Sequence, residues 1–155
     1  MGILIGSISI GIVIIIVLVM FAIRAVSAKM LIKVKEELTE KYSSEHFRDK
    51  TSANFFGLRS DGAGQVRGNG VLLLSDRMLI FRLLIPARWY EVRIENIFKI
   101  SHPWSFLGKS HLSKLLVIDF TDDQGQENAI GFLVKEPDEW AKKIIEASGR
   151  EIPID

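Results

Sequence analysis

Residues 70–81, GVLLLSDRMLIF, carry the clearest structural signal in the chain. Two apolar runs rich in Val, Leu and Ile stand on either side of Ser75-Asp76, a pair typical of turns. Two short β-rich runs separated by a turn signal predict neighbouring antiparallel strands.

The same pattern continues on both sides of this pair of runs. Seven β-rich runs follow one another between Thr51 and Val134, at intervals of roughly ten residues. Parallel neighbours would need crossover helices, for which the connections are too short, so we expect antiparallel pairing. The expected fold is a mainly-β domain of about seven antiparallel strands in a closed or nearly closed barrel or sandwich. The runs cover residues 52–59, 65–75, 77–85, 88–94, 97–101, 112–120 and 127–134.

One C-terminal helix is expected after the strands. Pro137 stands at a first-turn position, Gly149 provides a stop and Pro153 follows it. Trp140 and Ile144 belong to one apolar face of this helix. We expect that face to close one opening of the barrel.

The residues also resemble a known family. Residues 70–81 are similar to the G-x-L-x-L-S/T-x-x-x-L-x-F hairpin of GRAM domains, members of the pleckstrin-homology-like (PH-like) superfold. Residues 92–97, VRIENI, resemble the IPLxDI strand and turn of the same family, and Trp140 stands where the superfold places a Trp on its closing helix. The resemblance covers about residues 50–148, some two thirds of the chain. It implies a PH-like barrel that serves as a binding and targeting module, and it carries over no active site.

The N-terminal stretch is of a different kind, because residues 1–23 carry no charged side chain. As a helix that rises 1.5 Å per residue, residues 3–23 would extend about 31 Å, close to the roughly 30 Å core of a bilayer. We therefore predict an uncleaved transmembrane helix within residues 1–23. A processed signal peptide and a buried core helix are the alternatives.

Flanking charges predict the orientation of this anchor. Lys and Arg residues follow it from Arg24 to Lys41 and none precedes it, so the C-terminal domain is expected in the cytoplasm. Gly2 and Gly6 have the small-xxx-small spacing that lets two membrane helices approach, which makes a span-driven homodimer an option.

The remaining boundaries follow from periodicity and polarity. Helical periodicity predicts a juxtamembrane stalk over residues 24–42, and the polar residues 43–50 are expected to form a linker. The GRAM/PH-like domain is expected over residues 51–148, followed by a tail over residues 149–155.

Composition excludes several classes of protein. The 155 residues include 20 Lys plus Arg and 19 Asp plus Glu, which leaves a formal net charge of +1. A nucleic-acid-binding domain usually shows a strongly basic face, so no nucleic-acid partner is expected. The lack of Cys excludes a disulfide scaffold, a thiol nucleophile and a zinc ribbon.

Residues that could carry catalysis are sparse. His102 and His111 flank one loop without the spacing of a metal site. Asp122 and Asp123 stand at a Gly-containing turn, where Asp is favoured because it bonds its own backbone. The sequence contains neither a nucleophile elbow nor a P-loop. We therefore expect no catalytic residue, metal or cofactor, and predict that the chain is not an enzyme.

Arg59 and Arg67 are the candidates for contact with an anion. PH domains that read phosphoinositides carry Lys and then Lys/Arg-x-Arg along the first hairpin, and only these two arginines stand there. The carboxylates of Asp61, Asp122 and Asp123 would repel a multiply phosphorylated headgroup. Specific phosphoinositide recognition is therefore not expected.

The loop over residues 101–111 combines aromatic, basic and turn residues. Trp104, Phe106, Leu107 and Lys109 are the candidates for contact with a membrane or a protein partner. The alternative is that Trp104 and Phe106 fold back over the edge of the barrel.

These features lead to one functional prediction and one alternative. We expect a non-enzymatic single-pass membrane protein that presents a GRAM/PH-like module at the cytoplasmic face, where it contacts a protein partner or a lipid surface. The alternative is a structural or assembly subunit of a larger membrane complex, with no ligand of its own.

Overall fold

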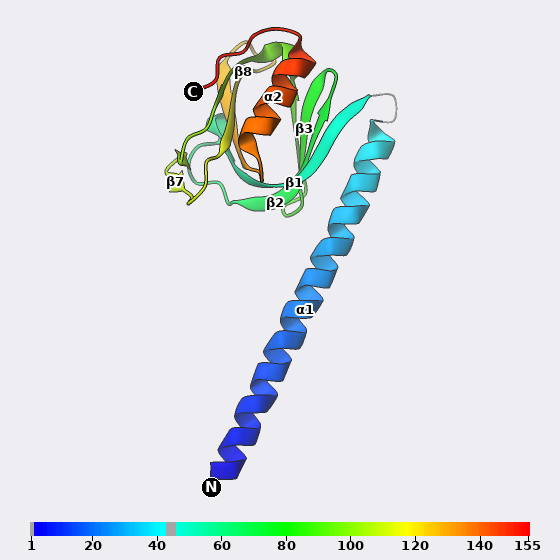
Figure 1. Ribbon diagram of the computed structural model, residues 1–155, viewed down its shortest axis with the longest axis vertical. Coiled ribbons are helices and arrows are strands. Elements are labelled where there is room, and N and C mark those ends of the chain that lie inside the picture. Colours follow the sequence, from blue (N-terminus) through cyan, green and yellow to red (C-terminus); the bar gives the residue numbers. More distant parts are fainter. Residues whose placement is uncertain (1, 43–45) are drawn as a thin grey trace.

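The computed structural model describes residues 2–42 and 46–155, and in its N-terminal helix it describes only part of the side chains. Helix α1 (Gly2–Lys41) projects from a β-rich domain on which helix α2 (Pro137–Ser148) packs (Figure 1). Short 3-10 turns, η1 (Arg59–Asp61) and η2 (Ile94–Asn96), follow β1 and β4. The strands are β1 (Phe47–Leu58), β2 (Gly68–Ser75), β3 (Met78–Leu83), β4 (Arg88–Arg93), β5 (Ile97–Ser101), β6 (Ser105–Phe106), β7 (Lys109–Ser110), β8 (Leu116–Thr121) and β9 (Glu127–Leu133).

Seven of these strands form one antiparallel sheet in the order β4-β3-β2-β1-β9-β8-β5. Each of the seven predicted runs corresponds to one of them, so the mainly-β antiparallel fold with a C-terminal helix is confirmed. Strands β6 and β7 form a separate short hairpin inside the connection from β5 to β8, which the sequence pattern did not predict.

The turn between β2 and β3 shows why residues 70–81 have this conformation. The Ser75 hydroxyl is buried and accepts hydrogen bonds from the backbone N–H groups of Arg77, at 3.2 Å, and Met78, at 3.0 Å. This short polar side chain satisfies backbone donors within the turn, which is the physical reason that Ser favours such positions.

The expected closed barrel needs a correction, because the sheet is open. Strands β4 and β5 are its two edges, and no ladder joins them within the described residues. The physical reason is that the outer edge of β5 is bonded to the segment after α2. The Ile100 N–H donates to the Pro153 carbonyl at 2.9 Å, and the Asp155 N–H donates to the Ile100 carbonyl at 3.0 Å.

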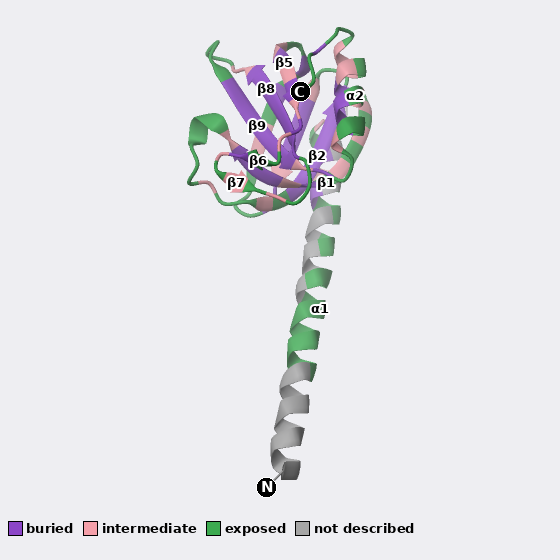
Figure 2. Ribbon diagram, turned by 60° about the vertical axis from the view of Figure 1, so that its left-hand side comes forward, coloured by how far each residue is buried: buried purple, intermediate pink, exposed green. Residues whose placement is uncertain are grey.

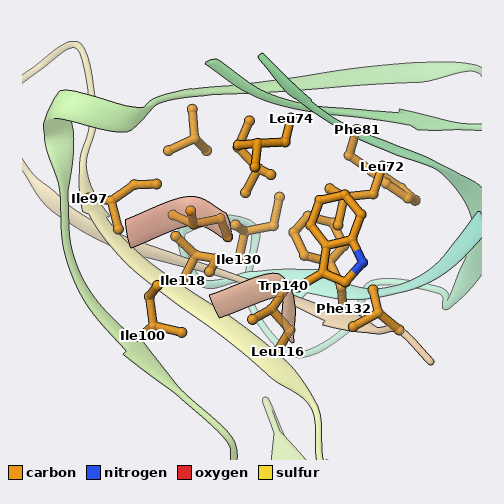
Figure 3. Close-up of a cluster of buried hydrophobic side chains, with 14 of the residues drawn as sticks. Leu72, Leu74, Phe81, Ile97, Ile100, Leu116, Ile118, Ile130, Phe132 and Trp140 are labelled. Carbon is orange, nitrogen blue, oxygen red and sulfur yellow. The ribbon is translucent and has the colours of Figure 1, made fainter. Parts of the chain in front are cut away.

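The inner face of the curved sheet encloses the main core (Figure 3). Helix α2 covers this core with Trp140, Ala141 and Ile144, all buried, as its apolar face predicted. The helix begins with Pro137 and ends at Gly149, whose φ of 64° is the left-handed conformation that favours glycine. Side chains from all seven strands of the sheet and from α2 meet in this core, including those of Leu72, Leu74, Phe81, Ile97, Ile100, Leu116, Ile118, Ile130, Phe132 and Trp140.

The last turns of α1 pack on the outer side of β2 and β3. Val34 and Leu38 are buried against a helix-covered face made of Val71, Leu73, Ile80 and Leu84. Beside this contact, the Lys41 Nζ lies 3.3 Å from Glu91 Oε1 and 4.2 Å from the centre of the Trp89 ring. The Tyr42 hydroxyl also donates to the Glu91 carboxylate.

The predicted transmembrane anchor needs a correction as well. Helix α1 continues without interruption to Lys41, and its last turns pack on the β domain. Over the part of the chain that the structure describes, no helix combines the length and the apolar character needed to cross a membrane. The transmembrane and single-pass assignments are therefore withdrawn. Gly2 and Gly6, on which the predicted span-driven homodimer rests, are among the helix residues whose surroundings lie outside those described.

The domain begins earlier than the sequence suggested. Strand β1 starts at Phe47, where a polar linker over residues 43–50 was expected, and Lys50 already pairs with Leu73. Phe47 is partly buried against the helix-covered face. This part of the strand could not be recognised in the sequence, because Arg48, Asp49 and Lys50 are polar and, of residues 47–50, Phe47 alone packs on an apolar cluster.

Candidate functional site

Three loops of the domain lie close together and form what we call the loop rim, residues 59–67, 84–87 and 102–115. Gly68, directly after the first loop, lies against the second, because a Cβ added to it would stand 3.3 Å from the Ile85 carbonyl oxygen. The Arg67 guanidinium donates to the Ser110 carbonyl at 2.9 Å, which joins the first loop to the third. The Lys109 ammonium donates to the Phe56 carbonyl at 3.0 Å. Strands β6 and β7 of the rim lie on the half of the domain from which α1 projects (Figures 1 and 2).

Of the four residues predicted to contact a membrane or partner, Phe106 and Leu107 point toward the sheet. Phe106 is 8% exposed and packs with Leu115 on a loop-covered face made of Phe56, Val117 and Ala129. Its ring lies over Gly131, where an added Cβ would stand 2.6 Å from a ring carbon. Leu107 packs in the same way over Gly57, whose φ of 145° also favours glycine. Of the two readings of this loop, Phe106 follows the one in which the loop folds back over the barrel.

Four other side chains of the rim are exposed and apolar. Trp104 is 57% exposed, and sequence reasoning had selected it. Val66, Ile85 and Leu112 are exposed by 79%, 73% and 96%, and sequence reasoning missed them. The signal that could have found them is a single aliphatic residue inside a polar or turn segment, such as Leu112 between His111 and Ser113.

The rim also carries cations that lack an acidic partner. Among the described residues, no carboxylate lies within ion-pair distance of Arg67, Lys109 or Lys114. Burial, and then the neighbouring charge of Arg67, lower the pKa of Lys109 from its usual value. The Arg67 guanidinium stacks 4.1 Å above the centre of the Phe56 ring. This part of the surface is therefore locally positive, although the whole chain is nearly neutral.

The other anion candidate, Arg59, is already paired. Its guanidinium lies 2.8 Å from Asp119 Oδ1, and the Asp119 side chain is only 12% exposed. Asp61 lies 2.9 Å from Arg88, so it is neutralised rather than free. Asp122 accepts the backbone N–H groups of Gln124 and Gln126 at 2.9 Å, as expected for a turn residue. The structure thus separates Arg67, which has no acidic partner, from Arg59, which does.

An open groove of about 550 Å³ borders the rim beside α1. Its lining includes Ile85 and Leu84 from the second loop, and Ala28 from the helix. Within the described residues, no group of three His, Asp or Glu side chains is arranged to hold a metal ion. The two histidines of the third loop have different surroundings. His102 is buried beside Asp138, whereas His111 accepts a hydrogen bond from the Ser113 N–H.

Comparisons with known proteins show the fold alone. Neither a family model nor a curated protein matches the chain. Among solved structures it is similar to the C-terminal domain of an unknown protein from Leishmania infantum, with a TM-score of 0.52 and 13% identity over 76% of this chain and 97% of that one. It is also similar to the hSac2 domain from human phosphoinositide phosphatase Sac2, with a TM-score of 0.53 and 13% identity over 77% of this chain and 85% of that one. These likenesses define the class of fold, a sheet-rich domain with a C-terminal helix.

Proposed function

We propose that this chain is a non-enzymatic binding module of the PH-like, GRAM-related type that attaches to an anionic membrane surface through its loop rim. The observation that carries the proposal is the combination of exposed apolar side chains, Trp104 and Leu112, with cations that no described carboxylate neutralises. The placement of the domain on the cytoplasmic side stays a prediction.

The spacing of the exposed apolar side chains and the positive charge of the loop rim favour a membrane over a protein partner. The exposed apolar side chains are spread over three loops, one on the first, one on the second and two on the third, and Arg67, Lys109 and Lys114 belong to the first and third of these loops. The centre of a protein interface is usually one apolar patch depleted of Lys. A membrane interface instead accepts separate aromatic and aliphatic side chains, and each nearby Lys or Arg adds about 1 kcal/mol of attraction to anionic lipid.

The same geometry predicts little discrimination between headgroups. Arg59 is paired with Asp119, and Arg88 is paired with Asp61, so neither is free to bind a phosphate. The remaining cations form a diffuse positive surface rather than a fork of several donors around one point. We expect binding that depends on the total negative charge of the membrane and weakens with salt.

The test measures the depth of Trp104 in vesicles that contain a brominated, quenching lipid. With phosphatidylserine present, we expect the full chain to show tryptophan quenching that is lost in Trp104→Phe and that salt reverses. This readout is specific to the rim, so adhesion of the apolar part of α1 does not mimic it. Quenching that is unchanged in Trp104→Phe would contradict the proposal.

A charge reversal with a matched control tests the electrostatic part. Lys114→Glu should weaken binding to phosphatidylserine vesicles, whereas Lys142→Glu on α2, an exposed position outside the rim that is paired with Glu139, should have a smaller effect. Strong preference for a phosphoinositide over phosphatidylserine at equal charge would reject headgroup-indifferent binding.

A second function, an assembly subunit, is favoured by one observation on α1. The apolar side chains from Ile14 to Phe21 are exposed by 50% to 74%. Burying such a surface against other proteins would release much hydrophobic free energy. A subunit role predicts co-purification with another protein at fixed stoichiometry, which substitution of Trp104 would not disturb.

A further inference from the structure

The outer edge of β5 is occupied by the chain itself. The Ile100 N–H donates to the Pro153 carbonyl, the Asp155 N–H donates to the Ile100 carbonyl, and the His102 N–H donates to the Asp155 carbonyl at 2.9 Å. Ile100 and Ile154 form a parallel bridge. Residues 150–155, which we call the edge segment, therefore add a short strand to the sheet.

A compact turn after α2 directs the edge segment onto β5. Gly149 ends the helix in the left-handed conformation, and the Ser148 hydroxyl donates to the Arg150 carbonyl at 3.0 Å. The Arg150 guanidinium then donates to the Glu95 carbonyl at 2.8 Å and to the Ile97 carbonyl. Four backbone groups along this edge are thus bonded by the edge segment: the Ile97 carbonyl, the N–H and carbonyl of Ile100, and the His102 N–H.

Two side chains give this contact chemical selectivity. Ile152 is 5% exposed and belongs to the main core, whereas Ile154 is half exposed. The Asp155 carboxylate forms an ion pair with Lys99, and this hydrogen bond raises the pKa of Lys99. The edge therefore accepts an extended backbone with an aliphatic residue three positions before an acidic one.

Few contacts hold the edge segment compared with the strands of the sheet. Among the described residues, its backbone bonds to the sheet are those at Ile100 and His102, and its side chains add the bonds of Arg150, the ion pair of Asp155 and one buried aliphatic residue, Ile152. Segments with so few buried contacts open locally at much lower free energy than the whole domain. When it opens, β5 presents unpaired N–H and C=O groups, which are a template for another strand.

We propose that the edge of β5 is a binding site for an extended peptide of a partner protein, and that the edge segment occupies this site as an internal competitor. The partner peptide carries an aliphatic residue three positions before Asp or Glu, as Ile152 and Asp155 do. This inference is independent of the loop rim, because it uses β5 and the residues after α2.

The test measures binding of a fluorescent peptide with the sequence of residues 149–155, GREIPID, to full-length chains. The variant Ile152→Ser with Asp155→Ala weakens the competitor and leaves β5 unchanged. We expect it to bind the peptide at least ~10-fold more tightly than the parent chain, because the apparent affinity scales with the fraction of open sites. Adding Lys99→Glu to this variant should reduce the increase in affinity for the peptide. A peptide with Ser in place of the residue equivalent to Ile152 should not bind.

Hydrogen exchange in the parent chain provides a second measurement that does not depend on the stability of a variant. The amides of Ile100 and His102 should exchange through local opening, faster than the amide of Ile118 in β8, and added peptide should slow them. Exchange of all three amides only through global unfolding would overturn the proposal. A folded double variant that binds no peptide would also overturn it, as would a concentration-dependent dimer that exchanges edge segments.

Discussion

The outer side of the sheet is covered at two places by two different kinds of segment. On the helix-covered face, Val34 and Leu38 of α1 pack on β2 and β3. On the loop-covered face, Phe106 and Leu115 pack on β1, β8 and β9. Both covers bury aliphatic and aromatic side chains that the strands would otherwise expose, yet they are connected to the sheet differently.

The loop cover is tied to the sheet at both ends, because residues 102–115 connect β5 directly to β8. The helix cover is tied at one end only, where the chain passes from α1 to β1. A weakened loop cover therefore disturbs two strands of the sheet, whereas a weakened helix cover can separate as a unit. Although both covers bury apolar side chains, the loop cover therefore contributes more to the stability of the domain than the helix cover does.

The largest effect is expected on the loop cover. Phe106→Ala should lower the free energy of unfolding by about 3–5 kcal/mol, because it removes a buried ring and leaves a cavity over Gly131. Urea denaturation measures this loss. Trp104→Ala, in the same loop but exposed, is the control and should change stability by no more than about 0.5 kcal/mol. Equal small losses for both variants would show that the loop cover is not integral to the domain.

The helix cover should respond to Leu38→Ala by undocking rather than by unfolding of the domain. We expect a loss of about 2–5 kcal/mol in the free energy of docking, with a much smaller change in the unfolding of the sheet. Because the chain has no Cys, spin labels at Ile32→Cys and Gln124→Cys report one distance between α1 and the domain. This distance should broaden in Leu38→Ala and stay narrow in Val19→Ala, a control on the exposed part of α1.

Alkaline pH should weaken the docking of the helix cover and stabilise the loop cover. Hydrogen bonding with Tyr42, and then with Glu91, raises the pKa of Lys41 above 10.5, so its contribution to docking is present below that value and is lost as the pH rises through the raised pKa. Burial lowers the pKa of Lys109, so the loop cover gains stability as the pH rises from that lowered pKa toward 10.5.

The spin-label distance therefore should broaden at high pH, and Glu91→Gln should shift this change to lower pH. A helix that stays docked until the whole domain unfolds at alkaline pH would contradict the separable cover.

The smallest effect is expected where the loop cover meets the first loop of the rim, residues 59–67. Arg67→Ala removes the guanidinium above the Phe56 ring and its bond to the Ser110 carbonyl, and should cost about 0.5–1 kcal/mol of stability. Chemical denaturation measures this change, with Arg77→Ala in the exposed β2–β3 turn as control. A loss as large as that of Phe106→Ala would mean that Arg67 holds the loop cover in place.

Much of the fold could be predicted from the sequence because its signals are local. The seven strands follow from short β-rich runs between turn residues, and the ends of α2 follow from Pro137 and Gly149. Helical periodicity predicted a helix over residues 24–42, and Val34 and Leu38 form one buried face of it. The target of that face could not be predicted, because helical periodicity says nothing of what the face packs against.

The candidate site was predictable only in part. The pattern selected Trp104, which is exposed, together with Phe106, which is buried, because an aromatic residue in a loop looks the same in both settings. The space that receives Phe106 is made by Gly131, which lies 25 residues further along the chain. Sequence spacing does not reveal such a contact between distant segments.

By itself, the sequence determined the strand order along the chain, the turns and the C-terminal helix, since these depend on neighbouring residues. Only the tertiary structure decided that the sheet stays open between β4 and β5, that α1 and the loop over residues 102–115 cover its outer side, and that residues 150–155 complete the edge of β5. These features depend on which apolar faces and unpaired backbone groups meet in space, and burial drives such meetings whatever the distance along the chain.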